Sequence, residues 1–352
     1  MSVRLYGRVM GHGSHAQVTH GFQTALNSAG LLSGTLGLDV TGLDDKLSTG
    51  ATGSALAQHG VFTGPLVQVD ELRRSKHARR WVMVAPNSNW MPPRQIEAIN
   101  EVATDVLVPS NWAAEMLGPL VSKPITVVPH GVHAGFVRQE SANERLQQEY
   151  AAGQFRVLHC STSERQRKGT WELLQAWDEI KVRHLLPDAA MLYLVLDQAA
   201  QIRLAERMWE NNLKPHGVHV MARLDAAPHV MAEVLRTAHV VCQPSRSEAF
   251  GMIPIEALAC GTPIVATACT GHAAYLLPQR AGSILIENGD EAPIDDGPGA
   301  VAPTVNSDDI RDALQVAHEH WRDFAVRAFD DAPAVVREWS WSRQLAPWLE
   351  AL

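Results

Sequence analysis

Two glutamates eight positions apart, Glu248 and Glu256, stand in a pattern that can do chemistry. An apolar run that ends before Glu248 predicts a buried strand, and the Phe-Gly turn after it predicts the start of a short helix. The first turn of such a helix offers unpaired backbone N–H groups, which suit an anionic phosphate. A carboxylate within the helix can hydrogen-bond paired hydroxyls such as those of a ribose. Alternatively, Glu256 only complements the helix dipole and Glu248 is a solvated loop residue.

A second group of polar residues follows the strand predicted over Phe155–Cys160. Arg165 and Lys168 precede Gly169, after which a helix is predicted over Thr170–Lys181. Preorganised cations at such a place stabilise the negative charge that builds on a leaving diphosphate when a sugar–phosphate bond breaks. An exposed basic loop is the alternative explanation of the same residues.

The region around Glu248 resembles the signature of retaining nucleotide-sugar glycosyltransferases with the GT-B architecture, specifically glycosyltransferase family 4. The matching positions are Glu248, Phe250, Gly251, Glu256, Ala257, Ala259, Gly261, Pro263 and Val265. Lys168 and Gly169 also match the family. Ser163 stands where the usual arginine would be, so Arg165 is expected to substitute from a shorter loop.

The resemblance implies a role for each matched residue. Glu256 would hold the ribose hydroxyls, Lys168 and Arg165 the diphosphate, and Glu248 the transferred sugar, so that Glu248, Lys168 and Arg165 form the catalytic group. Further donor contacts are expected from Phe250, Gly251, Met252, Ile253, Arg223, Thr270 and Gly271. The glutamate that relatives carry just after this last loop is absent. Neither metal nor cofactor is expected, because a UDP- or GDP-sugar is itself the co-substrate.

The acceptor side of a GT-B cleft is expected in the first half of the chain. A glycine loop after the first strand can approach a ligand closely, and the expected cleft residues are Gly11, His12, Gly13, Ser14, Asn87, Asn89 and His130. The spacing of the nearby histidines fits no metal site. A plain strand–helix turn, and a packed histidine at a strand end, remain open as alternatives.

Short apolar runs alternate with helical patterns along the whole chain. The predicted strands are Arg4–Val9, Gly60–Pro65, Trp81–Ala85, Asp105–Pro109, Ile125–Pro129, Phe155–Cys160, Met191–Leu196, Val218–Met221, Val240–Gln243, Ile264–Ala266 and Ser283–Ile286. The predicted helices include Gln17–Ser28, Arg94–Glu101, Asn111–Leu117, Thr170–Lys181, Ala200–Asn211, Val230–Arg236 and Ser307–Arg322. This alternation predicts an α/β protein with two Rossmann-like domains of parallel sheet.

The expected domains are an acceptor domain over residues 1–140, a polar linker over 141–153 and a nucleotide-sugar domain over 154–325. Residues 326–352 carry three tryptophans in a helical pattern, and the resemblance implies that this tail is a helix crossing back to the first domain. The alternative is that these tryptophans belong to the core of the second domain.

Composition bounds the remaining possibilities. With 46% apolar and 19% charged residues, the 352-residue chain is expected to be globular. No apolar stretch has the length of a membrane span and the start lacks the pattern of a signal peptide, so a cytoplasmic protein is expected. Four cysteines at no metal-ligand spacing indicate reduced buried thiols.

The net charge of −8 is uneven, since residues 1–140 hold 11 Lys/Arg against 10 Asp/Glu. The basic run Arg73–Arg80 is either a solvated helix face or a patch for an anionic acceptor. Transfer of a sugar to a small molecule, glycan or lipid is the default expectation. Transfer to a hydroxymethylated base in DNA is the first alternative, a non-catalytic nucleotide-sugar-binding protein the second, and a dinucleotide oxidoreductase the third.

Overall fold

The computed structural model describes residues 2–8, 14–37, 59–63, 69, 72, 77–161, 166–211, 213, 216–222, 226–277 and 280–352. The chain divides into two compact units. Unit 1 comprises Met1–His133, Asp225–Ala227 and Arg337–Leu352, and unit 2 comprises Ala134–Leu224 and Pro228–Val336. Each unit is built on its own six-stranded sheet, so the prediction of an α/β chain with two parallel sheets is confirmed.

The sheet of unit 1 has the order β2-β1-β3-β4-β5-β6, with every neighbouring pair parallel. Its strands are β1 (Val3–Gly7), β2 (Leu32–Gly37), β3 (His59–Phe62), β4 (Arg79–Met83), β5 (Asp105–Val108) and β6 (Ile125–Val127). The helices described in this unit include α1 (Ser14–Ser28), α3 (Pro93–Val102), α4 (Asn111–Leu117) and α13 (Trp341–Glu350). Ser110 caps α4, because its hydroxyl oxygen accepts a hydrogen bond from the Ala113 N–H at 3.1 Å.

Helix α13, from the end of the chain, packs against α1 in unit 1. The Phe22 ring lies 6.2 Å from the Trp341 ring and 5.6 Å from the Trp348 ring, between centroids. Trp348 in turn meets Trp81 of β4 edge to face at 5.8 Å. The tryptophans of the tail that are buried, Trp341 and Trp348, therefore belong to the core of unit 1 and not to that of unit 2.

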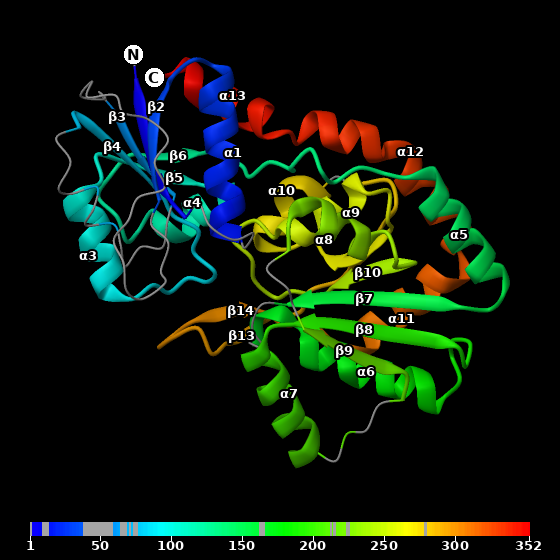
Figure 1. Cartoon of the computed structure of the whole chain (residues 1–352). Helices are drawn as coiled ribbons and strands as arrows, with labels where there is room; N and C mark the ends of the chain where they lie inside the picture. The colour runs from blue at the N-terminus through cyan, green and yellow to red at the C-terminus, as the bar shows by residue number, and fades with distance from the viewer. Residues whose placement is uncertain are drawn as a thin grey trace. The chain divides into compact units, whose positions relative to one another are not determined.

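The sheet of unit 2 has the order β12-β11-β10-β7-β8-β9 and is also parallel throughout. Its strands are β7 (Phe155–Ser161), β8 (Ala190–Leu196), β9 (Val218–Ala222), β10 (Val240–Gln243), β11 (Ile264–Thr267) and β12 (Ser283–Ile286). Its helices include α5 (Glu140–Ala151), α6 (Thr170–Val182), α7 (Gln198–Glu210), α8 (Pro228–Leu235), α9 (Met252–Ala259), α10 (Ala273–Leu276), α11 (Ser307–Glu319) and α12 (Trp321–Glu338). Figure 1 labels the helices of this unit and its strands β7, β8, β9 and β10.

Helix α6 shows how the sequence produces this packing. Leu173, Leu174, Trp177 and Ile180 recur at three- and four-residue spacing and are all fully buried. They pack into the core cluster that also holds residues of β7, β8 and α11. Among the described residues, no helix is both long enough and apolar enough to cross a membrane.

Three segments differ from the expectation. The polar stretch expected as a linker over 141–153 is mostly helix α5, which buries Ala142 and Leu146 and belongs to unit 2. The tail from residue 326 is two helices, α12 and α13, with Trp339 and Ser340 between them. The segment Glu287–Pro303, whose glycines and prolines are typical of a loop, contains an antiparallel hairpin, β13 (Glu291–Pro293) and β14 (Val301–Pro303).

The contact of α13 with α1 makes a prediction about Gly21. A Cβ added to Gly21 would lie 2.1 Å from the Trp341 ring, where only a shift of the ring could make room. Helix propensity alone predicts that Gly21→Ala stabilises the chain by about 1 kcal/mol. We expect the opposite sign, a loss on the order of 1–3 kcal/mol from overpacking, measured by urea unfolding. In a Trp341→Ala background the same change should become stabilising, and a stabilising effect in the wild-type chain would contradict this packing.

Candidate functional site

The strand order of unit 2 reverses between β7 and β10. These strands are neighbours in the sheet, with β8 and β9 on one side and β11 and β12 on the other. In an open parallel sheet, ligands bind outside the carboxyl ends of the strands at such a switch point. The loops that follow β7 and β10 carry Lys168 and Glu248, so the topology brings the two sequence motifs together (Figure 1).

The two loops come into close contact at Gly169. This residue has a φ of 65°, and a Cβ there would lie 2.0 Å from the Pro244 carbonyl oxygen. Both features require glycine. The Arg246 N–H also donates to the Arg167 carbonyl at 2.7 Å, which ties the short 3-10 turn η2 (Gln166–Lys168) to the loop after β10.

Glu248 is the centre of a buried group of charges, and its side chain is 11% exposed. The Lys168 ammonium forms a short hydrogen-bonded ion pair with Oε1 of Glu248. The Arg167 guanidinium donates to Oε2 at 3.3 Å, and the Ser245 hydroxyl donates to Oε1 at 3.2 Å. Two cations from the loop after β7 thus meet one carboxylate from the loop after β10.

These neighbours keep Glu248 ionised. Burial works to raise the pKa of its carboxyl group, but Lys168, Arg167 and His272 outweigh burial and lower the pKa from 4.5 to about 2. The stabilisation by this charge is therefore present above about pH 4.5 and is lost as the pH falls toward 2.

The turn that leads into α9 depends on Gly251, which has a φ of 75°. A Cβ on Gly251 would lie 2.0 Å from Nε2 of His272. The Tyr275 hydroxyl donates to the Gly251 carbonyl, and the Tyr275 ring lies 5.2 Å from that of Phe250. Phe250 is therefore a buried anchor, while Gly251, Met252 and Ile253 are only half-buried at the start of the helix. Their position gives this helix an accessible N-terminal turn.

The loop after β11 supports Glu248 through its backbone. The Thr270 hydroxyl oxygen accepts a hydrogen bond from the Glu248 N–H at 3.0 Å, and the Gly271 N–H donates to the Glu248 carbonyl at 2.8 Å. Nδ1 of His272 donates to the Thr267 carbonyl at 3.0 Å, which fixes the ring beside Gly251. Thr270 and Gly271 thus lie next to Glu248, and their contact with the donor stays a prediction.

Glu256 lies on α9, one turn into the helix, and is 2% exposed. It belongs to the same structural unit as Glu248 and Lys168, at the same switch point of the sheet. Its assignment to the ribose stays a prediction.

Several predicted residues fall outside the described part of the chain, namely Arg165, Arg223, Gly11, His12 and Gly13. Ser14 is the first residue of α1. In unit 1, Asn87 and Asn89 are exposed in the segment after β4. His130 is buried there, with its ring 5.6 Å from that of Trp341, in agreement with the alternative of a packed strand-end histidine.

Sequence reasoning missed Arg167. The resemblance led to the prediction that Arg165 takes the place of the family arginine. Arg167, however, directly precedes Lys168, and its side chain is only 9% exposed. Arg167 also faces Asp296 in the segment between β13 and β14, with Nε 4.0 Å from the carboxylate. The hairpin itself is fastened by Arg246, which donates to the carbonyls of Pro303 (2.8 Å) and Ala292 (3.2 Å). The placement of the hairpin is a tertiary contact that no local pattern indicated.

Of the five Lys/Arg residues in the basic run Arg73–Arg80, only Arg79 and Arg80 lie in the described part of the chain, and both have partners within unit 1. Arg79 donates to the Asp105 carboxylate at 2.7 Å and lies over the Trp81 ring. Arg80 donates to the Val102 carbonyl at 2.7 Å. These two side chains connect the start of β4 to β5 and α3 within their own unit.

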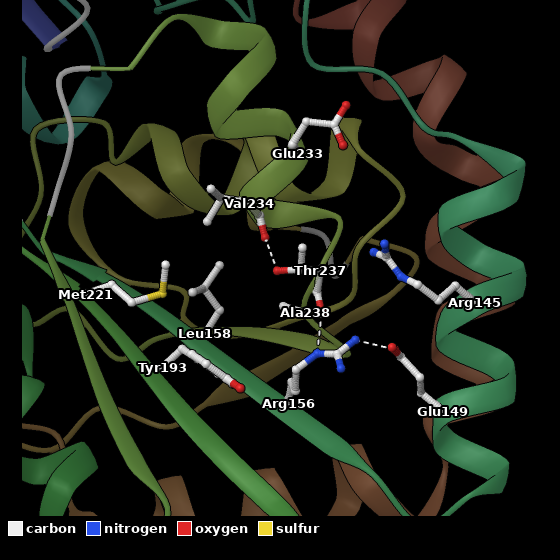
Figure 2. A pocket seen from close by; sticks show the side chains of 10 residues that line it. All are labelled: Arg145, Glu149, Arg156, Leu158, Tyr193, Met221, Glu233, Val234, Thr237 and Ala238. Atoms are coloured by element: carbon white, nitrogen blue, oxygen red, sulfur yellow. Dashed lines mark hydrogen bonds and ion pairs between the residues drawn. The ribbon is translucent and has the colours of Figure 1, made fainter.

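A separate cavity of about 430 Å³ lies beside β7, β8 and β9, and residues of α5 and α8 also line it. Figure 2 shows that Arg156 in its lining contacts both Glu149 and the Thr237 carbonyl. Its apolar lining consists of Leu158, Tyr193, Met221, Val234 and Ala238. None of these residues takes part in the Lys168–Glu248 group.

The burial of Glu248 predicts a pH-dependent effect on stability. Glu248→Gln leaves Lys168 and Arg167 without their counter-charge, so we expect the free energy of unfolding at neutral pH to fall by on the order of 2 kcal/mol. The difference in the free energy of unfolding between this variant and the wild-type chain should shrink as the pH drops below about 4.5, because the stabilisation by the ionised carboxylate is lost as the pH falls toward 2. Urea unfolding across this pH range measures it. Glu206→Gln, at an exposed position on α7, is the control and should show no such difference.

Comparison with solved structures identifies the fold. Sucrose-phosphate synthase from Thermosynechococcus elongatus aligns over 100% of this chain and 98% of its own, with a TM-score of 0.70 and 17% identity. HepE from Anabaena, solved with UDP and glucose, aligns over 100% of both chains with a TM-score of 0.66 and 16% identity. WaaG, a glycosyltransferase involved in lipopolysaccharide biosynthesis, aligns over 98% and 99% with a TM-score of 0.62 and 14% identity.

Curated relatives match shorter segments. D-inositol 3-phosphate glycosyltransferase from Mycobacteroides abscessus is 47% identical over 55 residues, which is 16% of this chain and 12% of that protein. The enzyme of the same name from Corynebacterium jeikeium is 34% identical over 106 residues, 30% of this chain and 24% of that protein. The chain thus matches less than a quarter of the length of these two relatives.

The family model described as glycosyl transferases group 1 matches residues 154–296, a range that belongs to unit 2 except for residues 225–227 and contains both loops of the switch point. The chain therefore has the GT-B fold, and residues 154–296 match the family model of glycosyl transferases group 1.

Proposed function

We propose that this chain is a retaining glycosyltransferase that moves a sugar from a nucleotide-diphosphate sugar to an acceptor hydroxyl. The observation that carries the proposal is the meeting of Lys168 and Arg167 with Glu248 at the β7–β10 switch point, beside the N-terminal turn of α9. Cations and helix N–H groups suit a diphosphate. A carboxylate beside them suits the hydroxyls of the sugar.

In the proposed reaction the bond between the sugar C1 and the diphosphate oxygen breaks while a bond from the acceptor oxygen to C1 forms. The acceptor attacks on the face that the diphosphate leaves, and its proton passes to the departing diphosphate oxygen. The negative charge that develops on the diphosphate is stabilised by Lys168 and Arg167. The reaction therefore needs no dedicated base from the protein.

Arg167 takes the role in this proposal that the sequence assigned to Arg165. Its guanidinium is buried, donates to Glu248 and lies on the same 3-10 turn as Lys168, so its charge is held in a fixed position. The half-buried Gly251, Met252 and Ile253 would add backbone N–H groups, and Glu256 would bind the ribose. For the donor, HepE was solved with UDP and with UDP-glucose, which favours UDP as the nucleotide to test first.

The acceptor half belongs to unit 1 in this proposal, with the exposed Asn87 and Asn89 as candidate contacts. The relatives named D-inositol 3-phosphate glycosyltransferase suggest a polyol phosphate as one acceptor to test. The described residues of the Arg73–Arg80 run give no support to DNA as an acceptor, because Arg79 and Arg80 are engaged within their own unit.

Substitution of the two cations tests the proposal. We expect Lys168→Ala and Arg167→Ala each to lower kcat/KM for UDP release from a UDP-sugar by roughly a factor of 100 or more, because each removes a preorganised charge from the leaving diphosphate. Release is measured by a coupled assay for UDP, with and without candidate acceptors.

Lys181→Ala provides a control of the same residue type on α6. Lys181 donates to the carbonyls of Asp188 and Ala190, away from Glu248, so its loss should leave kcat/KM unchanged. Turnover that survives both Lys168→Ala and Arg167→Ala would refute the proposed site. Binding of UDP-sugars without any turnover would instead indicate a non-catalytic nucleotide-sugar-binding protein.

A further inference from the structure

The cations proposed to hold the diphosphate both contact a carboxylate of the protein itself. Lys168 forms a short ion pair with one oxygen of Glu248, and Arg167 donates to the other at 3.3 Å. The side chains of Lys168, Arg167 and Glu248 are 13%, 9% and 11% exposed, so water screens these contacts little. A diphosphate that binds here must take Lys168 and Arg167 from Glu248.

Breaking such a buried pair is costly when one partner is left without compensation. Glu248 remains charged throughout the physiological range, because its pKa lies at about 2. A diphosphate that arrives therefore brings negative charge next to a carboxylate that has just lost its principal cation. The free energy of binding therefore depends on which hydrogen-bond donors replace Lys168 at Glu248.

The sugar-charged donor and the spent nucleotide differ at this point. The hydroxyls of a bound sugar can donate hydrogen bonds to the Glu248 carboxylate and so replace the N–H groups of Lys168. UDP alone has no such donor, and its terminal phosphate carries more negative charge than the same phosphate esterified to a sugar. Glu248 therefore resists the product more than it resists the donor.

We infer that Glu248 discriminates between the sugar-charged donor and the free nucleoside diphosphate, by competing with the diphosphate for Lys168 and Arg167. This inference rests on the proposed function and adds a second role to Glu248. After transfer, the carboxylate loses its sugar hydroxyls, pairs again with Lys168 and promotes release of the nucleotide.

Isothermal titration with UDP and with UDP-glucose tests the inference on the wild-type chain and on Glu248→Gln. We expect Glu248→Gln to bind UDP about tenfold more tightly than the wild-type chain, because the competing charge is gone. UDP-glucose should gain less or bind more weakly, since its sugar loses a strong acceptor. The dissociation constant for UDP divided by that for UDP-glucose should therefore be smaller in Glu248→Gln than in the wild-type chain.

Asp296→Asn is the matched control. Asp296 faces the Nε side of Arg167 at 4.0 Å, so its neutralisation removes a nearby charge without freeing Lys168. It should change the affinities for UDP and UDP-glucose by similar factors and leave their ratio unchanged. An equal fall of the ratio in Asp296→Asn would mean that general charge repulsion, and not the direct pair, sets the discrimination, and would overturn the inference.

Glu248→Asp guards against a folding defect in Glu248→Gln, because it keeps the charge but withdraws it from Lys168 by one methylene. Its affinity for UDP should lie between those of the wild-type chain and Glu248→Gln. A wild-type chain that binds UDP at least as tightly as both variants do refutes the competition while leaving the proposed function intact. If the wild-type chain and the variants bind neither UDP nor UDP-glucose, the proposed function itself fails and this inference with it.

Discussion

A charged carboxylate that is almost entirely out of water is the constraint around which unit 2 is organised. Glu248 can stay ionised there only if cations and hydrogen-bond donors reach it from the surrounding loops. Lys168 and Arg167 come from the loop after β7, Ser245 from its own loop, and the loop after β11 holds its backbone. Three loops at the ends of neighbouring strands thus meet at one residue, two of them at its carboxylate and the third at its backbone.

The backbone makes this convergence possible. Gly169 and Gly251 stand where a Cβ would collide with the neighbouring loop, at Pro244 and at His272 respectively. Both have a positive φ, so either substitution would cost conformational strain as well as space. The glycines of the sequence motifs therefore serve the meeting of the loops as much as the approach of a ligand.

The sequence predicted well what depends on local patterns. Its eleven expected strands correspond to strands of the two sheets, since apolar runs mark buried parallel strands directly. The edge strand β2 was not predicted because its sequence, Leu-Ser-Gly-Thr-Leu-Gly, has too few β-branched and apolar residues. Helix α5 looked like a linker because Ala142 and Leu146 provide only a narrow apolar face.

Within the site, local sequence patterns could not predict the contacts between residues far apart in the chain. Glu248, Lys168, Thr270 and Gly271 were found from motifs, and the structure brings these four residues together. The pairing of Arg167 with Glu248, and its contact with Asp296, depend on tertiary packing over 80 or more positions and have no local signature. Spacing could suggest an arginine near Lys168, but only the 3-10 turn decides which side chain points inward.

The packing of α13 into unit 1 has a consequence for the order of folding. The strands of unit 1 are synthesised before any of unit 2, yet the aromatic core around Phe22 lacks Trp341 and Trp348 until residues 341–350 have emerged from the ribosome. Unit 2 needs no residue beyond Val336. The unit that begins first is therefore completed last, and during translation its incomplete core is the surface most in need of protection from aggregation.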